Sequence, residues 1–158
     1  MRAWAAALLV LTIAMPAEAR LGDKVWTFKG SPLLQGDRLF RFEGLYGSRF
    51  QFCGARHCAF GDGVLALDVW DDTIDQESLV LPVPGTRRDQ ALEDHVATLF
   101  LQDSGLSAAD QAKALMAFQQ AYNDGETTDT HLAHGIHLRS ACTPDIDSVM
   151  LVLTQEKE

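Results

Sequence analysis

The spacing of apolar residues changes once along the chain, at Pro84 and Gly85, and this change constrains the fold more than any other feature. Upstream of it, short stretches alternate polar and apolar residues, which is the two-residue period of a half-buried strand. Downstream of it, apolar residues recur at the three- and four-residue spacing of amphipathic helices. This order predicts an α+β fold, in which a mostly antiparallel sheet carries a helix pair packed on one face.

Local signals set the expected limits of these elements. The sequence predicts strands at 25–29, 38–43, 49–52, 63–70 and 78–83, then helices at 87–102 and 107–122, then strands at 136–139 and 148–153. Ser107, with Asp110 three residues later, is a relative of the helix capping box. Gly125 follows the second helix as a stop signal, and Pro82 indicates that its strand ends there or lies at an edge.

The first nineteen residues have the organisation of a secretory signal. Arg2 supplies the positive charge, residues 3–15 form an apolar run, and Ala17-Glu18-Ala19 supplies the small-x-small cleavage pattern. The run is too short to span a bilayer, which takes roughly 20 apolar residues. We therefore expect a signal peptide at 1–19, a single domain at 20–158 without a membrane span, and a bacterial protein that is periplasmic or secreted.

The charge of the chain restricts its partners. It holds 13 Lys and Arg against 22 Asp and Glu, a net charge of −9. Such a surface repels phosphate backbones, so we expect no nucleic acid partner. It would attract a basic protein and speed encounter with it, although an acidic surface also serves solubility alone.

The chain has three cysteines, Cys53, Cys58 and Cys142. In an oxidising compartment the close pair Cys53 and Cys58 is expected to form a disulfide. The loop it closes is so short that the bridge would stabilise the fold by only about 2 kcal/mol, so stiffening a protruding loop is its better use. Cys142 is then buried and free, bonded to another chain, or a substitute for one partner of the bridge.

A C-x4-C loop between strands, with a histidine near its tip, resembles the inhibitor of vertebrate lysozyme (Ivy) family. The segment 26–30, Trp-Thr-Phe-Lys-Gly, is similar to that family's Trp-x-x-Lys-Gly strand end, and 50–52 is similar to its aromatic-Gln-apolar approach to the loop. The apolar strand 64–70 follows at about the family's spacing, so the resemblance covers roughly residues 25–83. It implies a periplasmic protein that plugs the active-site cleft of lysozyme with this disulfide-closed loop.

The residues expected to meet the enzyme are Gly54, Ala55, Arg56 and His57. Lysozyme-type clefts hold two carboxylates, one of them an acid with a raised pKa. Arg56 would offer such a cleft a bidentate partner, and His57 a partner tuned by pH. The alternative is that the disulfide only stabilises a hairpin and that the Arg56 and His57 side chains are solvated.

A second cluster suggests a different function. His131, His134 and His137 lie three residues apart, with Cys142 further on, and imidazole and thiolate groups suit Zn²⁺ or copper. Gly135 and its apolar neighbours indicate a loop entering a strand, which would scatter the three rings. A periplasmic metal-binding protein is therefore the alternative, and an envelope or immunity protein with another partner is the third.

The chain carries no nucleophile-and-base motif, no Gly-rich phosphate loop and no haem-attachment pattern. We therefore expect a binding protein that is not an enzyme and uses no cofactor, with a lysozyme-type enzyme as its partner.

Overall fold

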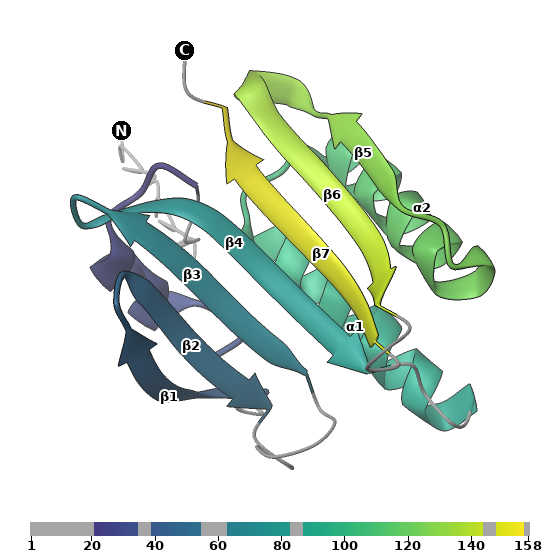
Figure 1. The fold of residues 1–158 in the computed structure, drawn as a ribbon, viewed down its shortest axis with the longest axis horizontal. Helices are drawn as coiled ribbons and strands as arrows, with labels where there is room; N and C mark the ends of the chain where they lie inside the picture. The colour runs from purple at the N-terminus through teal and green to yellow at the C-terminus, as the bar shows by residue number, and fades with distance from the viewer. Residues whose placement is uncertain (1–20, 35–38, 55–62, 83–86, 144–147, 157–158) are drawn as a thin grey trace, which may run out of the picture.

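The computed structural model describes residues 21–34, 39–54, 63–82, 87–143 and 148–156. Within them a seven-stranded sheet has the order β1-β2-β3-β4-β7-β6-β5, and every neighbouring pair is antiparallel. The strands are β1 (Phe40–Tyr46), β2 (Arg49–Gly54), β3 (Val64–Trp70), β4 (Thr73–Pro82), β5 (Thr128–His131), β6 (Ile136–Thr143) and β7 (Ser148–Gln155). The predicted α+β fold with an antiparallel sheet is thus confirmed (Figure 1).

Helices α1 (Arg87–Asp103) and α2 (Ala108–Asp124) lie on one face of the sheet, which we call the inner face (Figure 1). Ser107 caps α2 as predicted, because its hydroxyl accepts the backbone N–H of Asp110. Gly125 ends the helix in the left-handed conformation at φ 69°, where a glycine meets no steric cost. The predicted pair of helices is therefore confirmed in number, place and approximate length.

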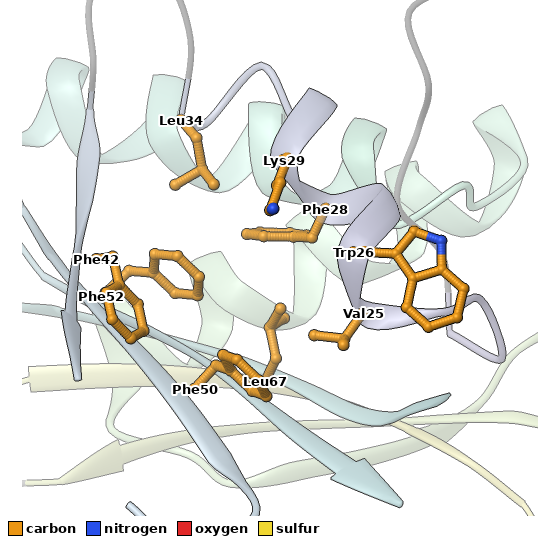
Figure 2. A pocket seen from close by; sticks show the side chains of 9 residues that line it. All are labelled: Val25, Trp26, Phe28, Lys29, Leu34, Phe42, Phe50, Phe52 and Leu67. Atoms are coloured by element: carbon orange, nitrogen blue, oxygen red, sulfur yellow. The ribbon is translucent and has the colours of Figure 1, made fainter. Parts of the chain in front are cut away.

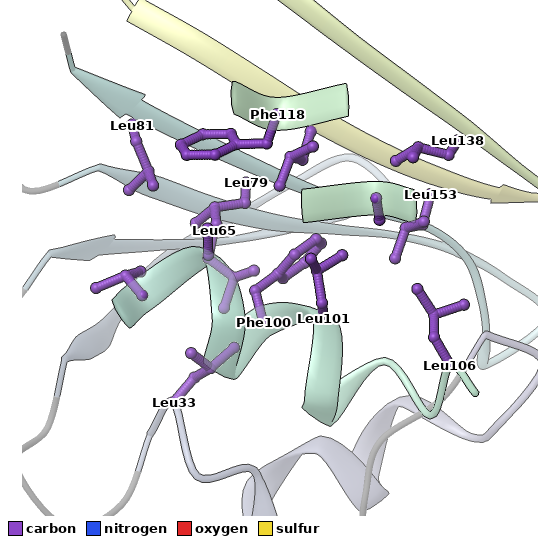
Figure 3. Packing of buried hydrophobic residues seen from close by; sticks show 14 of the residues in the cluster. Leu33, Leu65, Leu79, Leu81, Phe100, Leu101, Leu106, Phe118, Leu138 and Leu153 are labelled. Carbon is purple, nitrogen blue, oxygen red and sulfur yellow. The ribbon is translucent and has the colours of Figure 1, made fainter. Parts of the chain in front are cut away.

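The main core lies between these helices and strands β3, β4, β6 and β7. Phe100 and Phe118 from the helices pack against the strands together with fully buried leucines of the inner face (Figure 3). The leucines lie on alternate strand positions, as the two-residue spacing requires. They include Leu65, Leu79, Leu81, Leu138, Leu151 and Leu153.

Two predictions for the region before the helices were wrong. Residues 25–29 are not a strand: they belong to the 3₁₀ helix η1 (Val25–Gly30), which ends where the Ser31 N–H donates to the Phe28 carbonyl oxygen. Strand β4 begins at Thr73, because Asp71 and Asp72 complete a tight turn alone at φ 51° and 60°. Thus four strands, and not five, precede the helices.

Strand β5 (Thr128–His131) is the third strand after the helices, where two were predicted. Its sequence, Thr-Asp-Thr-His, is polar, and it pairs only with β6 at the edge of the sheet. The prediction missed it because an edge strand with no fully buried side chain leaves no apolar alternation in the sequence. A short 3₁₀ turn, η2 (Ala133–Gly135), then joins β5 to β6.

The opposite face of the sheet, the outer face, carries a polar row across four strands. Arg49 on β2 donates two hydrogen bonds of 2.7 Å to the carboxylate of Asp68 on β3. Gln76 on β4 donates to the same carboxylate at 2.8 Å, and the Thr154 hydroxyl on β7 donates to the Gln76 amide oxygen at 3.4 Å. The large apolar side chains of the main core, in contrast, lie on the inner face.

Within the described ranges, no helix is both long enough and apolar enough to cross a membrane.

Candidate functional site at the β2–β3 hairpin

The loop that the sequence singles out is held at both ends by the β2–β3 hairpin. Cys53 pairs with Val64 across the two strands, and the Gly54 N–H donates to the Gly63 carbonyl oxygen at 3.0 Å. The connection 55–62 therefore leaves and re-enters the sheet at directly paired positions. Gly54, one of the four predicted contact residues, is buried as the last residue of β2 and belongs to this base.

Four predicted site residues, Ala55, Arg56, His57 and Cys58, lie outside the described residues. Their predicted roles therefore stay predictions, as does the Cys53–Cys58 disulfide. Cys53 is buried, and the half-buried Cys142 carries a free thiol. Cys142 is therefore not a partner in a disulfide within the chain, whereas its bond to another chain stays a prediction.

Gly63 fixes the return of the loop into β3. Its φ of +96° is a conformation that side-chain-bearing residues rarely adopt. A Cβ atom there would lie 2.7 Å from the Val80 carbonyl oxygen and 2.7 Å from the Leu81 Cδ2 atom of β4. Only glycine lets the two backbones approach this closely at the foot of the loop.

The inner face of the same hairpin forms an apolar pocket that the sequence did not predict. It has a volume of about 410 Å³ and lies between η1 and strands β1 to β3 (Figure 2). Phe42, Phe50 and Phe52 form its strand side, and Val25, Trp26 and Phe28 form its η1 side. The remaining lining residues are Lys29, Leu34 and Leu67.

The pocket was missed because 25–29 was predicted to be a strand. A strand there would have extended the sheet, whereas η1 lies across it and walls the pocket. The available signal was the pair of alternating phenylalanine runs, Phe40 and Phe42 with Phe50 and Phe52. Their alternation indicated one apolar face, but not what covers it.

The histidine cluster does not converge. His131 and His137 face each other across β5 and β6 with ring centroids 5.2 Å apart, and each meets a carboxylate: Glu156 at 2.7 Å and Asp129 at 3.5 Å respectively. His134 lies apart, exposed in the turn at φ 60°. Among the residues that the structure describes, no group of three or more potential ligands could hold a metal ion.

Two buried carboxylates connect η1, α1 and β4, and neither was predicted from the sequence. Glu77 accepts a 2.7 Å hydrogen bond from the Ser104 hydroxyl, and Asp103 accepts one from the Ser31 hydroxyl. Burial raises the pKa of Glu77 to about 8, against the effect of the Ser104 hydrogen bond, and the nearby charges of Asp103 and Asp23 raise it further. Glu77 is thus held as a neutral acid at neutral pH, enclosed in the core.

No protein-family model matches the chain, and no curated protein or solved structure shows significant similarity to it.

Proposed function

We propose that the protein inhibits lysozyme or a related muramidase by inserting the loop that follows Gly54 into the enzyme's active-site cleft. The observation that carries the proposal is the base of the loop. The Gly54–Gly63 hydrogen bond and the Cys53–Val64 pair hold both ends of the connection in fixed register. A loop fixed at its base loses less conformational entropy on binding than a free segment.

The chemistry of the loop suits a cleft that contains carboxylates. Arg56 brings a guanidinium, which pairs with a carboxylate through two parallel hydrogen bonds. His57 adds a donor that is cationic when protonated. In this proposal the two side chains neutralise the acid and the carboxylate that a glycoside hydrolase needs for its reaction.

The rest of the chain favours encounter with a basic enzyme. Residues 55–158 hold 18 acidic side chains against six Lys and Arg. A field of this sign raises the association rate with a positively charged partner, and salt weakens it. The inhibition is therefore expected to become slower in onset as ionic strength increases.

The test is lysis of cell-wall suspensions by lysozymes of several types in the presence of the oxidised protein that begins at Arg20. An Arg56→Ala/His57→Ala variant should inhibit at least about tenfold more weakly, since one lost charge-assisted hydrogen bond is worth roughly 1.5–3 kcal/mol. The matched control is His134→Ala/Arg139→Ala, which removes the same two residue types from exposed positions on and beside β6. It should inhibit like the unaltered protein.

Reduction of the protein is the second arm, because the predicted bridge would stiffen the loop. Weaker inhibition by the reduced protein and by the loop variant, but not by the control, would assign the activity to this loop. If no lysozyme type is inhibited, or if both double variants lose inhibition equally, the proposal is wrong. An envelope partner of another kind would then be sought.

A further inference from the structure

We propose that the apolar pocket between η1 and strands β1 to β3 binds a fatty-acid-like carboxylate, with its alkyl chain in the pocket and its carboxylate beside Lys29. This proposal concerns a different surface from the loop and does not rest on the proposed inhibitor function. It rests on the lining of the pocket, on its size and on the charge at its rim.

The pocket has the size and lining of a small-ligand site. Its volume of about 410 Å³ lies in the range of roughly 300–1,000 Å³ that is usual for such sites. Eight of its nine lining residues are apolar or aromatic. Apart from the Lys29 ammonium and the Trp26 indole N–H, the lining has no hydrogen-bonding side chain. Most polar groups of a ligand there would lose their bonds to water without replacement, so the lining favours a hydrocarbon.

The aromatic walls of the pocket are packed against one another. The rings of Phe28 and Phe52 lie 5.3 Å apart, and those of Phe42 and Phe52 lie 5.7 Å apart in an edge-to-face arrangement. A third pair, Phe42 and Phe50, lies at 6.4 Å. These contacts fix the ring positions, so a ligand has little ordering cost to meet in the strand side of the pocket.

The pocket opens to solvent on the side of its more exposed residues. Trp26 is 55% exposed and Phe42 is 57% exposed, although both line an apolar surface. Exposed aromatic residues around a concave apolar surface are typical of interaction sites. One end of a bound chain would therefore remain in contact with water, where a charged head group keeps its hydration.

Charge at the rim selects the head group. Lys29 is exposed and is the single charged residue of the lining, and Figure 2 shows its side chain pointing from η1 toward the phenylalanines. Lys24 adds a second positive charge on the same segment, 5.9 Å from the centroid of the Trp26 ring. Both lysines favour an anionic head group over a cationic one.

The segment of the chain that forms most of the pocket also carries more positive than negative side chains. Residues 21–54, which supply all of the lining except Leu67, hold five Lys and Arg against three Asp and Glu. The remainder, 55–158, is strongly acidic, with six against 18. The segment that supplies most of the lining thus carries a small excess of positive charge in a chain that is otherwise acidic, which favours an anionic head group beside Lys29.

The experiment is a titration of the protein that begins at Arg20 with dodecanoate below its micelle concentration, followed by calorimetry. A Trp70→Phe variant leaves Trp26 as the one tryptophan of that protein, so its emission reports occupancy of the pocket. Dodecanoate should bind saturably with one molecule per chain and shift the Trp26 emission. Dodecyltrimethylammonium, with the same tail and the opposite charge, should bind at least tenfold more weakly.

Two variants separate the head-group contact from the tail contact. Lys29→Gln should weaken dodecanoate binding about tenfold and leave dodecyltrimethylammonium binding no weaker, whereas Lys113→Gln, at an exposed position of α2, should change neither. Val25→Phe should reduce the affinity for both amphiphiles by filling the η1 side. Circular dichroism must show that each variant is folded. Absence of saturable dodecanoate binding, equal affinity for the two head groups, or an unshifted Trp26 emission would each overturn the proposal.

Discussion

The two halves of the inner face differ in what covers them. Strands β4, β6 and β7 lie under α1 and α2, and their leucines are sealed against Phe100 and Phe118 (Figure 3). Strands β1 and β2, together with the part of β3 around Leu67, lie beside η1, a single short 3₁₀ helix that leaves the pocket between them open. The first half therefore has a closed core, and the second has a half-open pocket lined by phenylalanines (Figure 2).

The difference indicates that the two halves contribute differently to stability and to binding. A closed core maximises the apolar area removed from water, which is the main source of stability. An open pocket leaves part of that area exposed, at a cost in stability that a ligand could recover. The candidate loop leaves the sheet from the same open half, between β2 and β3. Stability is thus expected to reside mainly in the helix-covered half and binding in the other.

The largest expected effect tests this division with a matched pair of substitutions. Phe118 on α2 is 2% exposed, whereas Phe42 on β1 is 57% exposed. Phe118→Ala should lower the free energy of unfolding by about 3–5 kcal/mol, because it leaves a cavity in the closed core. Phe42→Ala should lower it by only about 1 kcal/mol, the contribution of its aromatic contacts. Urea unfolding of both variants gives the two values.

The comparison between the halves fails if the two substitutions cost the same. An intact unfolding slope, the m-value, is the control, since a changed slope would mean that the unfolded or native ensemble had changed as well. Phe42→Ala should in addition weaken dodecanoate binding, whereas any folded Phe118 variant should not.

The helix-covered half was the more predictable part of the fold. Helical spacing, the Ser107 cap and the Gly125 stop are local signals, and all three correspond to the structure. The strands 49–52 and 63–70 were also identified, because each alternates or carries a continuous apolar run. These predictions succeeded because the information lies within a few neighbouring residues.

The open half and the candidate site could not be predicted to the same extent. The segment 25–29 has the composition of a strand, but Lys24 pairs with Thr73 in a single bridge and the chain then turns into η1. Whether this segment forms a strand or a 3₁₀ helix therefore depends on contacts with residues distant in sequence. Likewise, the environment of buried Glu77 depends on Asp103, the last residue of α1, and on Ser104, which follows it. The sequence therefore indicated the loop, but neither the pocket on the inner face of the hairpin nor the buried acid.

The second prediction concerns the foot of the loop in the open half. Gly63→Ala should lower the free energy of unfolding by about 2–3 kcal/mol, since it combines a positive φ with a Cβ that meets the Val80 carbonyl oxygen at 2.7 Å. Gly47→Ala is the matched control: its φ of +66° is also positive, but a Cβ there meets nothing within 4 Å. It should cost about 1 kcal/mol. Equal losses in thermal unfolding would show that β4 does not constrain the foot of the loop.

The third prediction concerns Glu77, which lies at the border between the halves, because it pairs with the pocket residue Leu67 across β3 and β4. Its pKa is raised to about 8 in the folded protein, above the ordinary value of 4.5 that applies in the unfolded chain. Below pH 4.5 both states bind the proton and Glu77 imposes no cost. As pH rises toward 8, the unfolded state releases its proton more readily, so the folded state loses stability.

Glu77→Gln should remove this loss, because the amide oxygen still accepts the Ser104 hydrogen bond and carries no charge. Relative to the variant, the unaltered protein should lose at least about 1.4 kcal/mol of unfolding free energy between pH 5 and pH 8, the value of one pKa unit. Urea unfolding at both pH values measures the difference, with Glu126→Gln, an exposed site before β5, as the control that should show none. A difference of the opposite sign, with the variant relatively less stable at pH 8, would mean that Glu77 is ionised in the folded protein. The border between the halves would then be polar and hydrated, and the closed core would end at Leu79.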